Sequence, residues 1–491
     1  MTVPVSQSVA GRVVALPVRS SRLNSWIKDR VYSGQAWFGA LLALAFVARL
    51  YHFTSPPDDA HEWRQTQTLM YAASYGHGAG LLTPYGNWNG MPPKIDVLEF
   101  PIYSILVHWL SGLIDLLIAA RALSIVFGVA AILVFDRLCA QMGHPRRRTA
   151  TVLFALAPLT VFYAHATQPE SLVLLMMVAS AYFAVRGQTS WRWSVAALAS
   201  IAVAAVIKPT VLIILAPPVL YLAWSRKQWA RHLVVLAGAG IAILAWGTFV
   251  RGVLLSEDPL WYHVNTDPDW LWGSVSLRYS LDFYVVLAVR LLVAILPPFA
   301  ALFIVVAVWR RAGDPFWWWM AAGCLASYLV FAKLNAVHFY YQLPMVPALA
   351  ALAAYGAPRL PKRLAVRFVL VELLAVAVLF GCAGLYNEQP VYSTAGAAIA
   401  AVSSRNQPII VISKFGADPW WPSVLYYADS NGWNLPHGTD SSRIASLPGA
   451  TPCWLVNVRD EPGAAMVPNG WVVTRLTSDY LIAHNDACGT P

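Results

Sequence analysis

Long apolar runs separated by short polar segments fill the chain from about residue 37 to residue 387. Since about 20 apolar residues span the hydrocarbon core of a bilayer as a helix, the pattern predicts about eleven transmembrane helices. They are expected at 37–53, 119–140, 149–165, 170–186 and 192–207, directly before the basic segment 225–231, and at 232–250, 286–309, 315–332, 341–357 and 366–385. Pro297 and Pro298 are expected to kink the helix that contains them.

The apolar run at 102–117, "IYSILVHWLSGLIDLL", does not fit this alternation. If it crossed the membrane, the basic cluster at 144–148 would lie on the same side as the acidic segment after the first helix. We therefore interpret the run as an interfacial or re-entrant helix.

Polarity becomes ordinary after about residue 388, which predicts a small α/β domain over 388–491. The segments 408–413 and 453–458 have the pattern of buried strands, and 419–433 that of a helix followed by a turn. Cys453 and Cys488 in this domain form either a disulfide or two free thiols. The other three cysteines, Cys139, Cys324 and Cys382, are expected to be packing residues.

Composition and charge fix the orientation of these elements. Of 491 residues 58% are hydrophobic and 12% charged, against about 25% charged in soluble domains. The net charge of +10 comes from short Lys/Arg clusters between apolar runs, which indicates cytoplasmic loops rather than nucleic-acid binding. The basic segment 1–36 has no apolar core of the kind that a signal peptide has. We expect a multi-pass protein of the cell membrane with the N-terminus inside, and with the first loop (54–118), the Trp-rich acidic loop at 252–282 and the C-terminal domain outside.

This topology brings ionisable groups from distant segments to one membrane face. The stretch "DDAHEWRQTQTLM" (58–70) opens a long loop that runs to about residue 100, and long loops of this kind tend to be functional. The candidate residues on this face are Asp58, Asp59, His61, Glu62, Arg64, Gln65, Glu99, Glu170, Lys208, Lys333, His338, Tyr340 and Tyr341. Several also have a structural explanation, as interfacial anchors, as an aromatic belt or as a helix N-terminal charge.

Carboxylates and cations at a lipid surface suit the transfer of a group carried on a lipid phosphate. Lys208, Lys333, His338 or Arg64 would hold the phosphate, and a carboxylate would deprotonate an acceptor hydroxyl. Clustered carboxylates also suit a divalent cation such as Mg²⁺, Mn²⁺ or Ca²⁺, although no ligand spacing requires one.

The segments "HEWRQTQT", "EFPIY", "QPES", "IKPT" and "HFYY" resemble the GT-C glycosyltransferases of the protein O-mannosyltransferase and aminoarabinose transferase group. The resemblance implies an inverting transfer from a polyprenyl-phosphate sugar, with a first-loop acid as general base. His61 stands where that group has an Asp, which leaves Asp59, His61 and Glu62 as alternatives for the base. Glu99 matches the acid that ends the first loop, and Glu170 takes the place of an Asp in the second outer loop.

Two other functions remain open. A transporter or flippase of lipid-linked sugars would carry internal repeats and midplane charges, and the charges here gather at one face instead. A structural or sensor protein would use the outer domain to bind a partner. The acceptor of a transferase could be a glycan, a lipid or a protein.

Overall fold

The computed structural model describes residues 36–88, 90–97, 99–187, 189–298, 300–358, 361–382, 390–404, 407–417, 420–460, 467 and 469–488. Contacts divide the chain into two compact units, Met1–Leu44 and Ala45–Pro491. The described part of the first unit belongs to a helix at Ala36–Ala48. The basic segment 1–36 lies outside the described residues except for its last residue.

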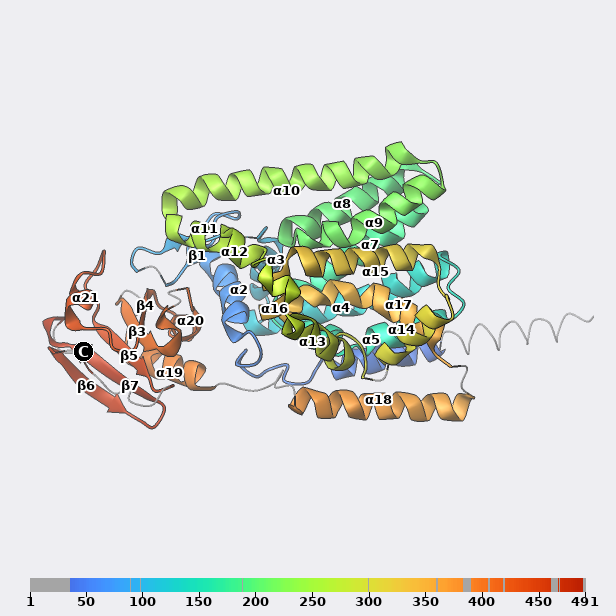
Figure 1. The fold of residues 1–491 in the computed structure, drawn as a ribbon. Helices are drawn as coiled ribbons and strands as arrows, with labels where there is room; N and C mark the ends of the chain where they lie inside the picture. Colours follow the sequence, from blue (N-terminus) through green and yellow to red (C-terminus); the bar gives the residue numbers. More distant parts are fainter. Residues whose placement is uncertain are drawn as a thin grey trace, which may run out of the picture. The chain divides into compact units, whose positions relative to one another are not determined.

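Helices make up most of the second unit (Figure 1). In chain order they are α2 (Glu62–Tyr75), α3 (Ile102–Ser111), α4 (Leu116–Gln141), α5 (Arg147–Ala155), α6 (Pro158–Tyr163), α7 (Glu170–Arg186), α8 (Trp191–Ile207), α9 (Thr210–Ser225), α10 (Trp229–Glu257), α11 (Pro259–Thr266), α12 (Pro268–Leu271), η1 (Ser276–Tyr279), α13 (Leu281–Arg290), η2 (Leu291–Ile295), α14 (Ala300–Trp309), α15 (Pro315–Val330), α16 (Ala332–Val337), η3 (Phe339–Met345), α17 (Val346–Gly356) and α18 (Lys362–Cys382). The pairs α4–α7, α7–α8, α8–α10, α9–α15 and α14–α17 pack against each other.

Two described helices, α4 and α10, are long and apolar enough to cross a membrane. The pair α13–η2 and α14 passes the same test together, with a bend of 115° at the break that contains Pro297 and Pro298. The helix expected at 286–309 is therefore broken at the predicted prolines, and whether its two parts form one span stays a prediction. Shorter apolar helices are Ala36–Ala48, α3, α8 and α9. The count of eleven spans stays a prediction.

Besides the bend at Pro297 and Pro298, four segments differ from the sequence prediction. The helix expected at 341–357 is α-helical only from Val346 (α17), and its first part belongs to the 3₁₀ helix η3, which contains Pro344. The helix expected at 149–165 is broken into α5 and α6, because Pro158 at the start of α6 cannot continue the hydrogen-bond ladder of α5. The long first loop contains α2, where we expected no helix. The loop expected at 252–282 is mostly helical, because Asp258 and Asp267 each precede a proline and cap α11 and α12 with their side chains.

Helix α3 has ten residues and is about 15 Å long at 1.5 Å per residue, too short to cross the hydrocarbon core. This length agrees with the prediction that the apolar run at 102–117 does not cross. The aspartate that follows, Asp115, caps α4 by accepting a hydrogen bond from the backbone N–H of Ile118.

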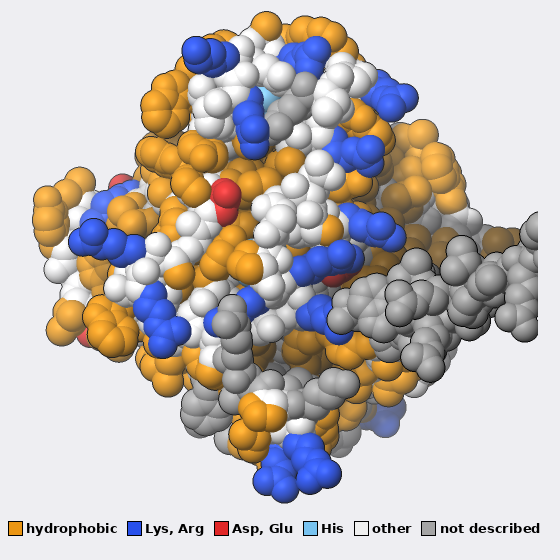
Figure 2. Space-filling view, turned by 90° about the vertical axis from the view of Figure 1, so that its right-hand side faces the viewer, with side chains coloured by type: hydrophobic (Ala, Val, Ile, Leu, Met, Phe, Trp, Pro, Cys, Tyr) orange, Lys and Arg blue, Asp and Glu red, His pale blue; other side chains and the backbone are white. Residues whose placement is uncertain are grey.

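Basic side chains gather on one face of the molecule (Figure 2), where acidic side chains are few. Arg186 at the end of α7 stacks on Trp193 at the start of α8, and Arg231 at the start of α10 donates to the carbonyl of Gly187. The α7–α8 and α9–α10 connections therefore meet at one end of the helices.

The C-terminal region contains α19 (Pro390–Ala400), β3 (Ile409–Ser413), η4 (Lys414–Ala417), α20 (Ser423–Tyr427), β4 (Gly432–Pro436), α21 (Ser441–Ala445), β5 (Trp454–Val458), β6 (Trp471–Leu476), β7 (Tyr480–Asn485) and η5 (Asp486–Cys488). The strand order is β4-β3-β5-β7-β6, with β3 parallel to β4 and β5, and β7 antiparallel to β5 and β6. Every residue of β3 and β5 is buried, as continuous apolar strands covered on both faces require. The two predicted strands and the predicted helix α20 are confirmed.

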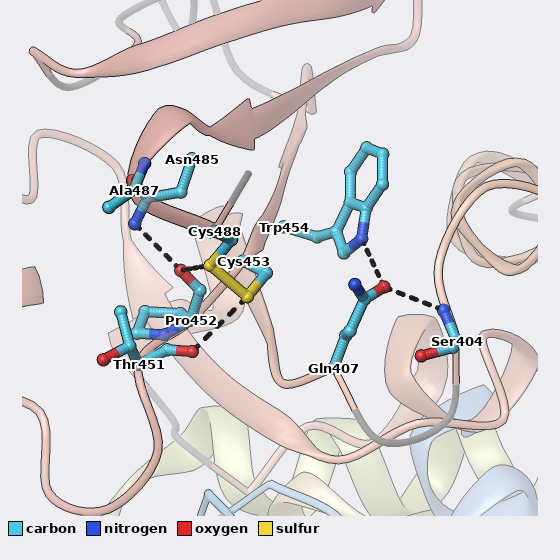
Figure 3. Close-up of a disulfide and its surroundings, with 9 residues drawn as sticks. All are labelled: Ser404, Gln407, Thr451, Pro452, Cys453, Trp454, Asn485, Ala487 and Cys488. Carbon is cyan, nitrogen blue, oxygen red and sulfur yellow. Dashed lines mark hydrogen bonds between the residues drawn. A yellow bond between two sulfur atoms is a disulfide. The ribbon is translucent and has the colours of Figure 1, made fainter. Parts of the chain in front are cut away.

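A disulfide joins Cys453, which directly precedes β5, to Cys488 in η5 (Figure 3). The bond ties η5 to the centre of the sheet, and the two cysteines are 35 positions apart in the sequence. Of the two alternatives for this pair, the structure has the disulfide. Cys139 and Cys324 are buried free thiols, as expected for packing residues. The side chain of Cys382 lies outside the described residues.

Candidate functional site

A cavity of about 400 Å³ lies where α2, the α8–α9 turn, α10, α11, α12, α16 and η3 meet. Its polar and aromatic wall includes Trp63, Arg64, Gln67, Glu99, Lys208, Trp246, Trp261, Tyr262, Asn265, Trp270, His338, Tyr340 and Tyr341. Six of the residues predicted from the sequence therefore line one hollow, although they come from four distant segments. These six are Arg64, Glu99, Lys208, His338, Tyr340 and Tyr341.

Helix α2 positions the first cation of this cavity. The Arg64 guanidinium pairs with the carboxylate of Glu99, and also donates to the side-chain oxygen of Gln67 one turn along the same helix. Burial raises the pKa of Glu99, while the charge of Arg64 opposes that shift. The pair thus puts a carboxylate and a guanidinium together at the wall of the cavity.

Lys208 supplies the second cation. It ends α8 in an extended conformation (φ −137°, ψ 97°), as expected for the residue before a proline, and α9 begins directly after Pro209. The Lys208 Nζ atom lies 2.6 Å from Glu170 Oε1 and 3.9 Å from the centre of the Tyr340 ring. Glu170 begins α7, so the N-terminal acid of one helix meets the C-terminal cation of the next, as the two helix dipoles favour.

Two histidines lie close together beside the cavity. The His61 ring is 5.5 Å from the His338 ring and 4.6 Å from the Phe339 ring. Burial, together with the positive charge of Lys208, lowers the pKa of His61 to about 3. Burial and the neighbouring His61 likewise lower the pKa of His338 to about 3. Both rings are therefore neutral near pH 7, so His338 offers a neutral hydrogen-bond donor rather than the cation that the sequence suggested.

Asp58 and Glu62 point to the C-terminal region rather than to the cavity. Asp58 accepts hydrogen bonds from Ser393 Oγ at 2.6 Å and from Tyr427 OH at 3.2 Å. Glu62 accepts hydrogen bonds from Trp421 Nε1 at 2.8 Å and from Ser423 Oγ.

Glu62 is 5% exposed. Its burial raises the pKa to about 8, although the hydrogen bonds from Ser423 and Trp421 oppose the shift. The Asp58 and Glu62 carboxyl groups fasten the first loop to α19 and α20, and neither lines the cavity.

Asp59 and Gln65 form a second buried layer behind the cavity. The Gln65 amide donates to Asp59, and its carbonyl oxygen accepts from the backbone N–H of Thr167 at 3.0 Å. Asp59 also lies 3.3 Å from His165 Nε2. These contacts fix the first loop to the α6–α7 connection.

Of the four predicted catalytic residues, Asp59, His61, Glu62 and Glu99, only Glu99 lines the cavity described above. Among the predicted substrate-binding residues, Gln65 and Glu170 lie behind the wall. Lys333 on α16 is exposed and does not line the cavity.

Of the tryptophan and tyrosine residues in the wall, only Tyr340 and Tyr341 were predicted from the sequence. Trp246 comes from α10, Trp261 and Tyr262 from α11, and Trp270 from α12. The two Asp-Pro pairs, at 258–259 and 267–268, were the signal that this segment is helical and ordered. No group of three or more His, Cys, Asp or Glu side chains within the described ranges could hold a metal ion.

Comparisons with known proteins support this fold. The family model of the Alg9-like mannosyltransferase family matches residues 93–276, a segment that contains Glu99, Glu170 and Lys208. No curated protein sequence matches the chain significantly.

ArnT from Cupriavidus metallidurans, in a crystal structure with bound undecaprenyl phosphate, is similar to this chain with a TM-score of 0.63 and 15% identity, over 93% of this chain and 99% of that one. The oligosaccharyltransferase of Archaeoglobus fulgidus, tethered with an acceptor peptide, has a TM-score of 0.51 and 13% identity, over 86% of this chain and 69% of that one. Its complex with an inhibitory peptide and a dolichol-phosphate has a TM-score of 0.50 and 12% identity, over the same shares of the two chains.

The chain thus has the GT-C fold of a polytopic helical membrane protein, and the predicted resemblance to the GT-C glycosyltransferases is confirmed. These comparisons also support the predicted enzyme class, a glycosyltransferase.

Proposed function

We propose that this protein is a membrane glycosyltransferase that moves a sugar from a polyprenyl-phosphate donor to an acceptor at the extracytoplasmic face. The observation that carries the proposal is the cavity that joins Arg64, Lys208 and Glu99 to an apolar membrane helix. ArnT, which shares the fold over nearly its whole length, binds undecaprenyl phosphate.

The chemistry of the cavity matches the two halves of such a donor. At one side the guanidinium of Arg64 and the ammonium of Lys208 would bind the phosphate, and His338 would donate a hydrogen bond. At another side Ile243, Trp246, Gly247 and Val250 recur on one face of α10 at helical spacing. This face would hold the first prenyl units.

Glu99 is our candidate for the general base, since it is the one residue of the predicted catalytic set in the wall of this cavity. The acceptor hydroxyl oxygen would attack the anomeric carbon, and its proton would pass to the Glu99 carboxylate. The bond from that carbon to the phosphate oxygen breaks, and polyprenyl phosphate leaves with its charge held by Arg64 and Lys208. Attack from the face opposite the leaving group inverts the anomeric configuration.

The membrane orientation is part of the proposal. The positive-inside rule assigns the basic face in Figure 2 to the cytoplasm. The first loop, the cavity and the C-terminal sheet would then lie outside. An outward cavity requires a donor that has been made inside and flipped.

Release of polyprenyl phosphate from a polyprenyl-phosphate sugar by the purified protein in nanodiscs tests the proposal. Replacement of Lys208 by Met should reduce release by at least about 30-fold, the equivalent of roughly 2 kcal/mol for a lost charged contact. Lys333→Met is the matched control, because Lys333 is exposed and outside the wall. Equal turnover in the two variants would refute the phosphate site. Headgroup translocation in vesicles without sugar transfer would favour a flippase instead.

A further inference from the structure

Arg290 is a cation inside a segment that the sequence predicts to cross the membrane, 286–309. Charged side chains in membrane segments are rare and costly, so each of them is a candidate for a functional role with an identifiable partner. Among the residues that the structure describes, no carboxylate forms an ion pair with the Arg290 guanidinium. Helix α13 ends at Arg290 and continues as η2, a short π-helix, and such turns are frequent at functional sites.

The hydrogen-bond partners of Arg290 are backbone carbonyl groups at the end of α16. Its Nη1 atom donates to the carbonyl oxygen of Asn335 at 2.5 Å, and its Nη2 atom to that of Ala336 at 2.8 Å. The last carbonyl groups of a helix have no partner within the helix, and a cation beside them also interacts favourably with the helix dipole. The planar fork of a guanidinium suits two neighbouring acceptors of this kind. Arg290 thus fastens the end of α16 to the end of α13.

A second side chain holds the same point of α16. Gln342 in η3 is completely buried, and its amide nitrogen donates to the carbonyl oxygen of Asn335 at 3.0 Å. Between α16 and η3, His338 has an extended backbone (φ −112°, ψ 114°). The connection from α16 to η3 is therefore fixed at the Asn335 carbonyl by two donors, one from η3 itself and one from α13.

This connection carries three side chains of the proposed donor cavity, His338, Tyr340 and Tyr341. The rings of His338 and Tyr340 stack, with their centres 5.0 Å apart and their planes at 12°. Lys208 Nζ lies 3.9 Å from the centre of the Tyr340 ring and 4.7 Å from that of the Tyr341 ring. A displacement of segment 338–341 would therefore move the hydrogen-bond donor of His338 and the two rings that lie against Lys208.

Arg290 itself does not line this cavity. We propose that Arg290 is a positioning residue of the donor site, which holds segment 338–341 so that His338 and Lys208 face the lipid phosphate. This inference rests on the proposed function. Loss of Arg290 should lower the affinity for the phosphate, because the groups that contact it are displaced. A purely structural role would instead reduce the amount of folded protein and leave the affinity of the folded protein unchanged.

Binding of polyprenyl phosphate to the full-length protein in nanodiscs, followed by tryptophan fluorescence, tests this proposal. Arg290→Met should weaken binding about tenfold, since small displacements at a site have effects of at least this order. Arg290→Lys keeps the charge but replaces the two-pronged donor by a single nitrogen, and should weaken binding about threefold.

Arg231→Met is the matched control. Arg231 also donates to a carbonyl group at a helix end, that of Gly187 directly after α7, and it lies outside the lining of the cavity. Its replacement removes the same kind of contact elsewhere in the molecule and should leave the affinity for polyprenyl phosphate unchanged.

A double-mutant cycle with His338→Ala tests whether Arg290 acts through segment 338–341. In the His338→Ala background, Arg290→Met should weaken binding by no more than about threefold, because one of the positioned side chains is already missing. Effects of the two substitutions that simply multiply would show that Arg290 does not act through this segment, and would overturn the inference.

Two other results would also overturn it: an affinity of Arg290→Met equal to that of the parent protein, or equal weakening in Arg231→Met. If Arg290→Met does not fold, the affinity of Arg290→Lys decides in the same way. Failure of the proposed function gives a different result. If binding of polyprenyl phosphate depends on Arg290 but no sugar is transferred, the positioning role stands and the transferase proposal fails. If the parent protein does not bind polyprenyl phosphate, both fail.

Discussion

Replacing Lys208 with methionine removes one partner of a buried ion pair. Lys208 Nζ and Glu170 Oε1 are 2.6 Å apart, with side chains 6% and 1% exposed. At an effective dielectric constant of about 20, this separation corresponds to about 6 kcal/mol of Coulomb attraction, most of it offset by the desolvation of both groups. The Glu170 carboxylate would remain buried without its cation, which typically costs about 3–5 kcal/mol.

The double variant Glu170→Gln/Lys208→Met removes both charges and keeps the side-chain volumes. Its free energy of unfolding should therefore return to within about 1 kcal/mol of that of the parent protein. Glu170→Gln alone should lower the free energy of unfolding less than Lys208→Met alone. The charge that it leaves unpaired is the Lys208 ammonium, which faces the cavity and lies over the Tyr340 ring. Denaturant titration of the four proteins in micelles gives the coupling energy.

Activity measurements distinguish the role of Lys208 in stabilising the fold from its proposed role in binding the phosphate. The double variant should be stable yet still release polyprenyl phosphate at least about 30-fold more slowly, because the phosphate contact is missing. A double variant that recovers both stability and turnover would show that Lys208 only stabilises the fold. Full additivity of the two stability losses would refute the ion pair itself.

Three further outcomes are expected. Glu99→Gln should abolish transfer but leave donor binding within about threefold, measured by titration with polyprenyl phosphate; unchanged transfer would exclude Glu99 as the base. Because the folded pKa of Glu62 is about 8 against 4.5 unfolded, its stability contribution is complete below pH 4.5 and is lost as pH rises through 8. Glu62→Gln should therefore flatten the pH dependence of unfolding by about 3 kcal/mol between pH 4.5 and 7; an identical pH profile contradicts this. Replacement of Cys453 and Cys488 by Ser should lower the free energy of unfolding by about 4 kcal/mol, since the two cysteines are 35 positions apart; equal denaturation midpoints for the reduced and the oxidised parent protein would contradict this.

The helical periodicity of α2 explains why some of its residues contact α20 while others line the cavity. Glu62 and Thr66, four residues apart, both contact Ser423, whereas Trp63 and Gln67 line the cavity together with Arg64. One turn of helix thus turns neighbouring residues toward different partners. Since we expected a loop here, we treated Asp59, His61 and Glu62 as equivalent candidates for the base.

The amino-acid sequence by itself predicted most of the helices and the gathering of the candidate polar residues, and the side of the membrane on which they lie stays a prediction. Apolar runs specify helices because every backbone group in lipid needs an internal partner, and Pro209, Pro158 and the Asp-Pro pairs specify where helices end or begin. The candidate residues at 64, 99, 208, 338, 340 and 341 were identified on this basis alone, and they meet in one cavity.

Only the tertiary structure decided which charges face that cavity and which are used to hold the chain together. Asp58 and Glu62 find their partners more than 330 positions away, in Ser393 and Ser423. Local propensity acts over a few residues, whereas the burial and pairing of a charge depend on whichever segment packs against it.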